Sequence, residues 1–221
     1  MKIIKTLKYK LTEGNIEKDI EKFILEARRG KFAWDYKYGN EGLKIIKAYF
    51  KMIQEKFDNN EFEECQKCYS KLILFLFDAS RGDDKASFGY EDLLAKVSKD
   101  FDKLIKNYFI CLIKVCDIEN LAEKIAEYAS KLKEYGFDSD KEILFQNLSK
   151  EQLKILEEKM LEKTVGMTKK DDGKHEIIYF LMSLTGVKKD KEKYILLCER
   201  FKGILDDKTF NYLKKEYEEN E

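Results

Sequence analysis

Apolar residues recur every three or four positions along most of the chain, which is the spacing of one face of an α-helix. The stretch 61–78, "EFEECQKCYSKLILFLFD", is apolar on nearly every side and therefore predicts a helix at the centre of the fold. No strand is predicted after residue 12. The predicted helices, in chain order, are 15–30, one ending at 57, 61–78, 90–116, 117–136, two shorter ones starting at Ser139 and Ser149, and 175–186, 189–204 and 207–219.

About ten helices joined by short polar turns predict an all-α protein, built as an array of antiparallel helix pairs. The chain has no proline, so its helices are expected to end at Gly, Asn, Asp or Ser. Near 163–174 the composition becomes polar and glycine occurs twice. We therefore expect a main helical-repeat domain over 1–165, with C-terminal helices over 166–221 packed on the same array.

Charged residues make up 39% of the 221 residues, and 43 basic side chains balance 43 acidic ones. This balance argues against a general nucleic-acid binder, although local patches at Lys2–Lys10 and Lys169–Lys170 remain possible. The longest apolar run, 72–77, is too short to span a membrane. Five cysteines without a disulfide-type spacing, and no visible signal peptide, predict a cytoplasmic protein.

Cys65-x-x-Cys68 is the only spacing in the chain that is typical of metal or redox chemistry. A structural zinc site needs four ligands, and His175 is the only histidine. A redox pair normally begins a helix, whereas this pair follows two glutamates inside one. Packing against a neighbouring helix is the favoured interpretation, and no metal or cofactor is expected.

Two loops flank the predicted hairpin 41–77 and carry the candidate binding residues. The linker 30–40, "GKFAWDYKYGN", either anchors itself in the core or presents a recognition surface. The acid pair Asp83-Asp84 of loop 78–89 could hold a hard cation, but it lacks the repeated D-x-D-x-D of a calcium loop, so a solvated loop is the favoured interpretation. We expect the two loops to meet, because they bracket the same hairpin at the same end. The candidate binding residues are Trp34, Asp35, Tyr36, Lys37, Arg81, Asp83 and Asp84.

The span 47–78, a helix, a short Asn/Asp turn and "EFEEC" opening a second helix, resembles a tetratricopeptide-type hairpin. On that resemblance Cys65 takes the small-residue position at the tight helix contact. Over residues 30–147 the chain also resembles the helical region of bacterial SWIM-type zinc-finger proteins, through "WDYK" (34–37) and "DASRGDD" (78–84). The C-x-C and C-x-H finger is absent, so the resemblance implies only a tetratricopeptide-like scaffold.

Three functions follow from these patterns. The first is a non-enzymatic helical-repeat scaffold that binds a protein or peptide partner in a groove between helix pairs. The second is a nucleic-acid-associated or defence-system accessory protein that uses the local lysine-rich patches. The third is an enzyme or metal protein that uses Asp35, Asp83 and Asp84, or the cysteines, and it requires these groups to converge.

Overall fold

A computed structural model describes residues 13–33, 36–80, 88–90, 92–132, 137, 139–171, 175–187, 190–205 and 211. Across these residues it contains ten α-helices and no strand, which confirms the predicted all-α class. None of the helices in the described part is long and apolar enough to cross a membrane. Contacts divide the chain into a first unit, Met1–Val115, and a second unit, Cys116–Glu221. The predicted boundary at 165/166 falls inside the second unit.

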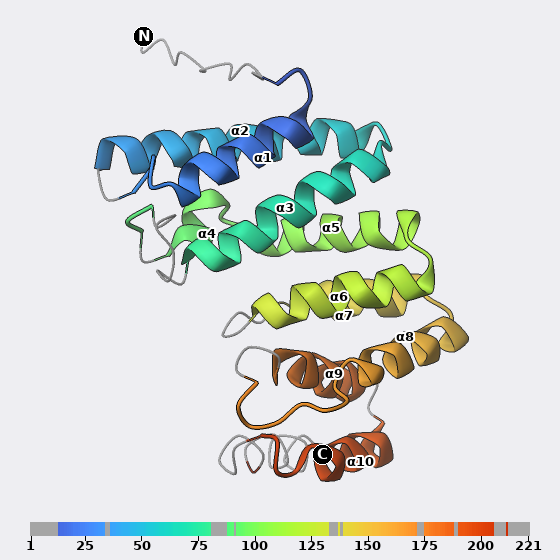
Figure 1. The fold of residues 1–221 in the computed structure, drawn as a ribbon. Helices are drawn as coiled ribbons and strands as arrows, with labels where there is room; N and C mark the ends of the chain where they lie inside the picture. The colour runs from blue at the N-terminus through green and yellow to red at the C-terminus, as the bar shows by residue number, and fades with distance from the viewer. Residues whose placement is uncertain are drawn as a thin grey trace. The chain divides into compact units, whose positions relative to one another are not determined.

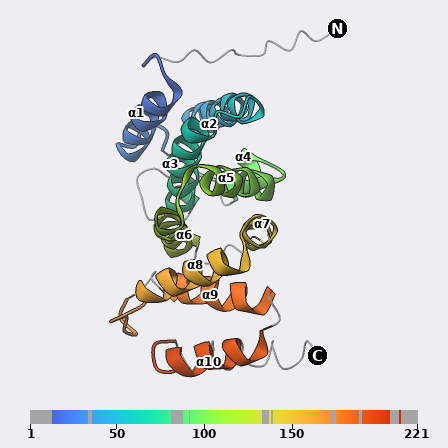
Figure 2. The ribbon, with the colours of Figure 1, turned by 90° about the vertical axis from the view of Figure 1, so that its right-hand side faces the viewer.

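The first unit is organised around α3 (Phe62–Ser80). This helix contacts all four of the others in the unit, and it lies between α1–α2 and α4–α5 (Figures 1 and 2). Burial around most of the helix explains this position, since eleven of its residues are buried, whereas Lys67 is exposed. The prediction of a central helix at 61–78 is therefore confirmed. The others are α1 (Ile16–Arg28), α2 (Tyr36–Asp58), α4 (Leu93–Val97) and α5 (Phe101–Val115).

The turn between α2 and α3 shows how a helix ends here without proline. Asn60 adopts the left-handed conformation, with φ 63°. Its N–H donates to Phe57 O at 2.9 Å, and the N–H of Glu61 donates to Lys56 O at 3.0 Å. This Schellman arrangement satisfies carbonyls that the helix end would otherwise leave unpaired. The predicted hairpin turn at 58–60 is thus confirmed, with asparagine in the place that glycine usually takes.

The continuous helix predicted over 90–116 is wrong, because the structure divides it into α4 and α5. At the break Ser98 has extended backbone, and its Oγ accepts the N–H of Asp100 at 3.2 Å. Asp100 Oδ1 in turn accepts the N–H of Lys103 at 3.1 Å and caps α5. Short polar side chains compete with helical hydrogen bonds in this way. The apolar rhythm hides the break, since Val97 and Phe101 are both buried.

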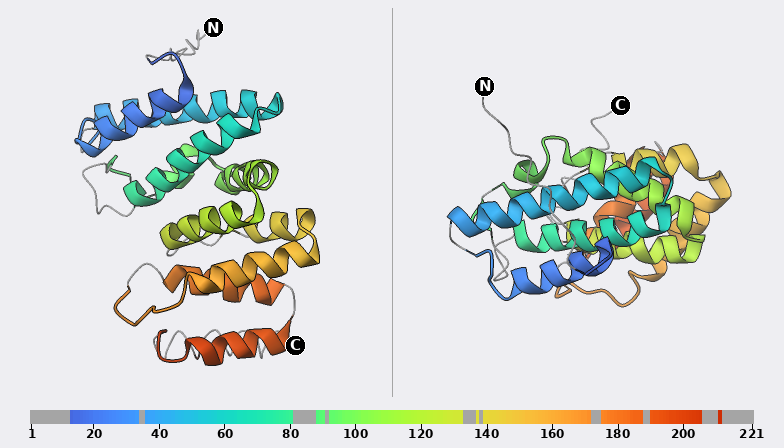
Figure 3. Two further views of the ribbon diagram at one scale, coloured as in Figure 1. Left: turned by 45° about the vertical axis from the view of Figure 1, so that its right-hand side comes forward. Right: turned by 90° about the horizontal axis from the view of Figure 1, so that it is seen from above.

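In its described residues the second unit contains five helices, of which α9 contacts α6, α8 and α10 (Figure 3). The predicted capping box at Ser149 is confirmed: its Oγ accepts the N–H of Gln152 at 3.2 Å, and Gln152 Oε1 accepts the N–H of Ser149 at 2.9 Å. Ser139, by contrast, is the first residue of its helix. The predicted helix 207–219 lies outside the described residues, apart from position 211. The helices are α6 (Ile118–Leu132), α7 (Ser139–Asn147), α8 (Lys150–Glu162), α9 (His175–Val187) and α10 (Lys191–Phe201).

A buried polar cluster joins α6 to the start of α7. The carboxylate of Asp140 is fully buried, and it accepts the Tyr128 hydroxyl at 3.0 Å and the Lys141 N–H at 2.7 Å. Lys141 Nζ lies 2.9 Å from the same carboxylate. Burial nevertheless raises the pKa of Asp140, although the neighbouring lysine and tyrosine oppose the rise. The ionised form is thus disfavoured in the folded protein.

Cys65 on α3 tests how closely that helix is packed. Its side chain has no solvent exposure, and Sγ lies 3.5 Å from Ile53 O of α2. Cys65→Ala should change the free energy of unfolding by less than about 1 kcal/mol, whereas Cys65→Leu should overpack the contact and cost about 1–3 kcal/mol. Urea denaturation followed by circular dichroism measures both. Lys67→Leu on the exposed face of α3 is the control, and an equal loss there would contradict the packing role.

The raised pKa of Asp140 predicts a pH dependence of stability. An unfolded aspartate titrates near about 3.9, so above that value the folded chain binds more protons than the unfolded chain. The free energy of unfolding should therefore fall as the pH rises through the higher pKa of folded Asp140. Asp140→Asn should remove this contribution to the pH dependence of the free energy of unfolding, which urea titrations at several pH values measure. Glu142 is exposed on the same helix, so Glu142→Gln should leave the pH dependence unchanged. An unchanged pH dependence in Asp140→Asn would refute its assignment to Asp140.

Candidate binding groove

The seven candidate residues of the two loops stay untested predictions. Tyr36 and Lys37 belong to the first turn of α2, but their side chains lie outside the description. The other five candidates, Trp34, Asp35, Arg81, Asp83 and Asp84, lie outside the described residues altogether.

The described ends of the two loops do meet. Phe32 and Phe88 stack with their ring centroids 6.0 Å apart, and both rings stack on Phe23 of α1. The Tyr90 hydroxyl also donates to Asn40 Oδ1 at 2.7 Å. The two stretches thus come together where they are described, and their meeting on one surface stays a prediction. Because Phe32 and Phe88 are 2% and 4% exposed, their contact is a buried anchor.

Two glycines on one face of α2 permit this contact. A Cβ atom at Gly39 would lie 2.6 Å from the backbone oxygen of Phe88. A Cβ atom at Gly42 would lie 2.5 Å from Cε1 of the Phe88 ring and 3.0 Å from Cγ of Phe32. Any larger residue at either position would displace Phe88. The glycines therefore set how closely the described end of the 78–89 loop approaches α2.

The cysteines are placed for packing. Cys65 and Cys68 are both fully buried, and burial, with the charge of Glu64 next, raises the pKa of Cys68 to about 12. A thiol with that pKa holds almost no thiolate at neutral pH, which disfavours redox chemistry. No group of three or more His, Cys, Asp or Glu side chains that could hold a metal ion occurs in the described part of the chain.

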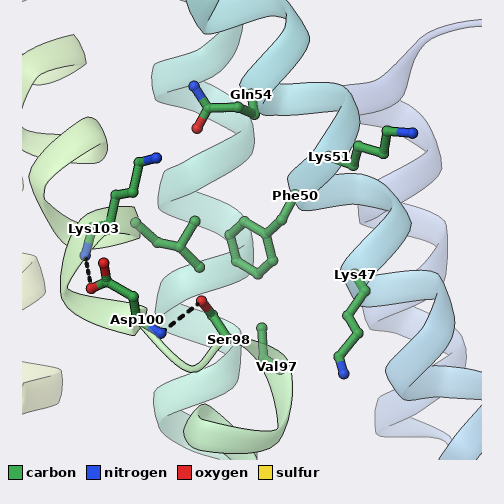
Figure 4. A pocket seen from close by; sticks show the side chains of 9 residues that line it. Lys47, Phe50, Lys51, Gln54, Val97, Ser98, Asp100 and Lys103 are labelled. Carbon is green, nitrogen blue, oxygen red and sulfur yellow. Dashed lines mark hydrogen bonds between the residues drawn. The ribbon is translucent and has the colours of Figure 1, made fainter.

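An open groove of about 290 Å³ lies in the first unit, between α2 and the turn that joins α4 to α5 (Figure 4). The α2 residues lie at i, i+3, i+4 and i+7, so a single face of that helix forms one wall. The end of α4, the turn with Ser98 and Asp100, and the first turn of α5 form the opposite wall. The lining residues are Lys47, Phe50, Lys51, Gln54, Val97, Ser98, Asp100, Lys103 and Leu104.

The floor of the groove is apolar and belongs to the core. In Figure 4 the Phe50 ring lies at the centre, between Lys47 on one side and Lys103 on the other. The same ring lies 6.2 Å from Tyr69 of α3 and 6.5 Å from Phe101 of α5. Because Phe50 connects three helices, the floor is held in place by core packing.

The rim is basic. Lys47, Lys51 and Lys103 are exposed, and none forms an ion pair with any described residue. The only acid in the lining, Asp100, already accepts the backbone N–H of Lys103. The Gln54 amide is engaged as well, with Asn107 and Asp58. The lining therefore contains three lysines against one carboxylate, which is an excess of positive charge.

The lining combines lysines with apolar side chains. The lining contains no histidine, cysteine or tyrosine, and its one hydroxyl, Ser98, already accepts a backbone N–H. Pockets for small molecules and cofactors measure roughly 300–1,000 Å³, so the volume of the groove lies at the lower limit of that range. Its size and chemistry favour a ligand with a small apolar group, which contacts the floor, and with negatively charged groups next to it, which meet the lysines.

Sequence reasoning missed the groove. The i, i+4 spacing of Lys47 and Lys51 was visible, but it is equally typical of any solvated helix face. Their association with Lys103 depends on a break in a helix that the periodicity predicts to be continuous. No local signal could therefore have identified the site.

Comparison with protein-family models, with curated proteins and with solved structures gives no match. The resemblance to the SWIM-type helical region accordingly stays a prediction.

Gly42→Ala tests the contact between α2 and Phe88. In an open helix position this substitution stabilises by up to about 1 kcal/mol, so a loss of stability would reverse the usual sign. We expect a loss of about 1–3 kcal/mol, because the new methyl group displaces Phe88. In the Phe88→Ala background the same change should be neutral or stabilising. Urea denaturation of the four proteins measures this cycle, and additive effects would contradict the contact.

Proposed function

We propose that the chain is a non-enzymatic helical scaffold that binds a protein or peptide partner, with the groove of the first unit as its binding site. The observation that supports this most directly is the apolar floor under three lysines that have no ion-pair partner among the described residues. Exposed cations beside buried apolar side chains suit recognition of a polypeptide segment, which offers both kinds of group.

The fold supports the same function. Packing of consecutive amphipathic helices leaves grooves between them, and helical-repeat proteins use such grooves for binding. We extend the proposal to a tetratricopeptide-like arrangement in the cytoplasm, on the strength of the hairpin formed by α2 and α3 and of the sequence patterns. Binding would then be the main activity of the first unit.

A second candidate, a nucleic-acid-associated or defence-system accessory protein, depends on lysine patches. Lys169 and Lys170 are exposed in a turn of the second unit. Asp171 lies beside them, and the chain as a whole has no net charge. The N-terminal lysines lie outside the described residues. A lysine pair beside an acid is a small footprint for binding a phosphate backbone, so the peptide-binding function is favoured.

Site-specific photo-crosslinking in cells that express the chain tests the proposed function. A photoreactive amino acid at position 51 faces the groove, and the same amino acid at position 67 lies on the exposed side of α3. We expect a polypeptide adduct at position 51 that is absent at position 67. The crosslinked segment, identified by mass spectrometry and synthesised, should bind the purified chain.

Two results would overturn the proposal. The first is that the adducts at positions 51 and 67 are the same, or that no adduct forms at 51. The second is that the adduct at position 51 is a nucleic acid, which would favour the alternative function.

A further inference from the structure

We infer that the groove of the first unit recognises an acidic peptide segment with one apolar side chain, in which carboxylates meet Lys47, Lys51 and Lys103 and the apolar group rests on the Phe50 floor. This inference depends on the proposed function and specifies its partner class. The structure supports it through three observations: the unpaired cations, their continuation along two helices, and the shape of the floor.

The groove lysines differ from several lysines elsewhere in the same unit. Lys56 pairs with Glu61 at 2.8 Å and with Glu64 at 2.7 Å, and Lys71 bridges α3 to Glu17 and Glu21 of α1. The three groove lysines have no such partner among the described residues. In a chain with equal numbers of acids and bases, this leaves a local excess of positive charge. An acidic partner would supply the missing carboxylates.

The basic rim continues along both helices. Lys44 lies one turn before Lys47 on the same face of α2, and Lys106 lies one turn after Lys103 on α5. Neither has an ion pair with a described residue. A ligand that follows this rim would carry several negative charges spaced along its length. A peptide segment rich in Asp and Glu has that spacing, whereas a single phosphate or carboxylate does not.

The floor distinguishes a peptide from a nucleic acid. Single-stranded nucleic acids bind through exposed aromatic faces on which bases stack. The only aromatic side chain in the lining is Phe50, which is 6% exposed, so the groove offers no series of aromatic faces on which successive bases could stack. Val97 and Leu104 are also nearly buried, and with Phe50 they form a shallow apolar surface that a single apolar side chain of a peptide can contact.

Selection from a phage-displayed library of short random peptides on the purified chain tests the inference. We expect enriched peptides to combine several Asp or Glu residues with an apolar residue. Their affinity should fall by about tenfold or more in the triple variant Lys47→Glu, Lys51→Glu, Lys103→Glu, because attraction becomes repulsion. High salt should also weaken the binding of these peptides to the wild-type chain, because it screens the attraction between charges. Fluorescence polarisation of labelled peptides measures both effects.

A matched control keeps the net charge change the same. Lys18, Lys67 and Lys114 are exposed lysines of the first unit that lie outside the groove and have no ion pair with a described residue. Reversing these three to Glu should leave the affinity within about twofold. Circular dichroism spectra that match the wild type show that both triple variants are folded.

The other outcomes separate this inference from the proposed function. The acidic partner class would be overturned by selected peptides that are neutral, crosslink at position 51 and bind the groove variant as tightly as the wild type. The proposed binding function would stand in that case. A library that yields no peptide, or peptides that bind outside the groove, would overturn both. Binding of a single-stranded oligonucleotide in the groove without any peptide binding would also overturn both.

Discussion

The first unit depends on the burial of α3 against four neighbouring helices. A helix whose residues are mostly buried has to be covered by neighbours on more than one side, because the burial of each large apolar side chain contributes about 1.5–3 kcal/mol of stability. In this unit α1 and α2 cover one side of α3, and α4 and α5 cover the other. The groove is a consequence of this covering, since α2 and the α4–α5 turn both adjoin α3 without closing over Phe50. Its floor is thus a core residue, held by Tyr69 and Phe101.

Each unit also contains one buried aspartate that accepts a tyrosine hydroxyl. In the first unit Tyr49 donates to Asp19 at 2.9 Å, and in the second Tyr128 donates to Asp140 at 3.0 Å. A buried carboxylate is costly unless its oxygens are hydrogen-bonded, so these pairs fix the relative positions of the helices that they join. Polar groups of this kind specify one packing arrangement among several that apolar contacts alone would allow.

The groove, and not the meeting point of the two loops, is the candidate binding surface of the first unit. The loops meet through Phe32 and Phe88, which anchor them in the core. The groove instead combines exposed, unpaired cations with an apolar floor, and this is the combination that a polypeptide ligand can satisfy. Its lysines come from stretches about fifty residues apart in the chain, 47–51 and 103, and only the packing of α2 and α5 beside α3 brings them together.

Features governed by neighbouring residues could be predicted from the sequence: the all-α class, the central helix at 61–78, the hairpin turn at Asn60 and the capping box at Ser149. Local hydrogen bonding and apolar periodicity are sufficient to specify each of them. The break at Ser98–Asp100 was missed, because a polar cap leaves the apolar rhythm intact on either side. Only the tertiary structure decided the groove, since it depends on that break and on long-range packing, and no local pattern records which helix faces lie opposite one another.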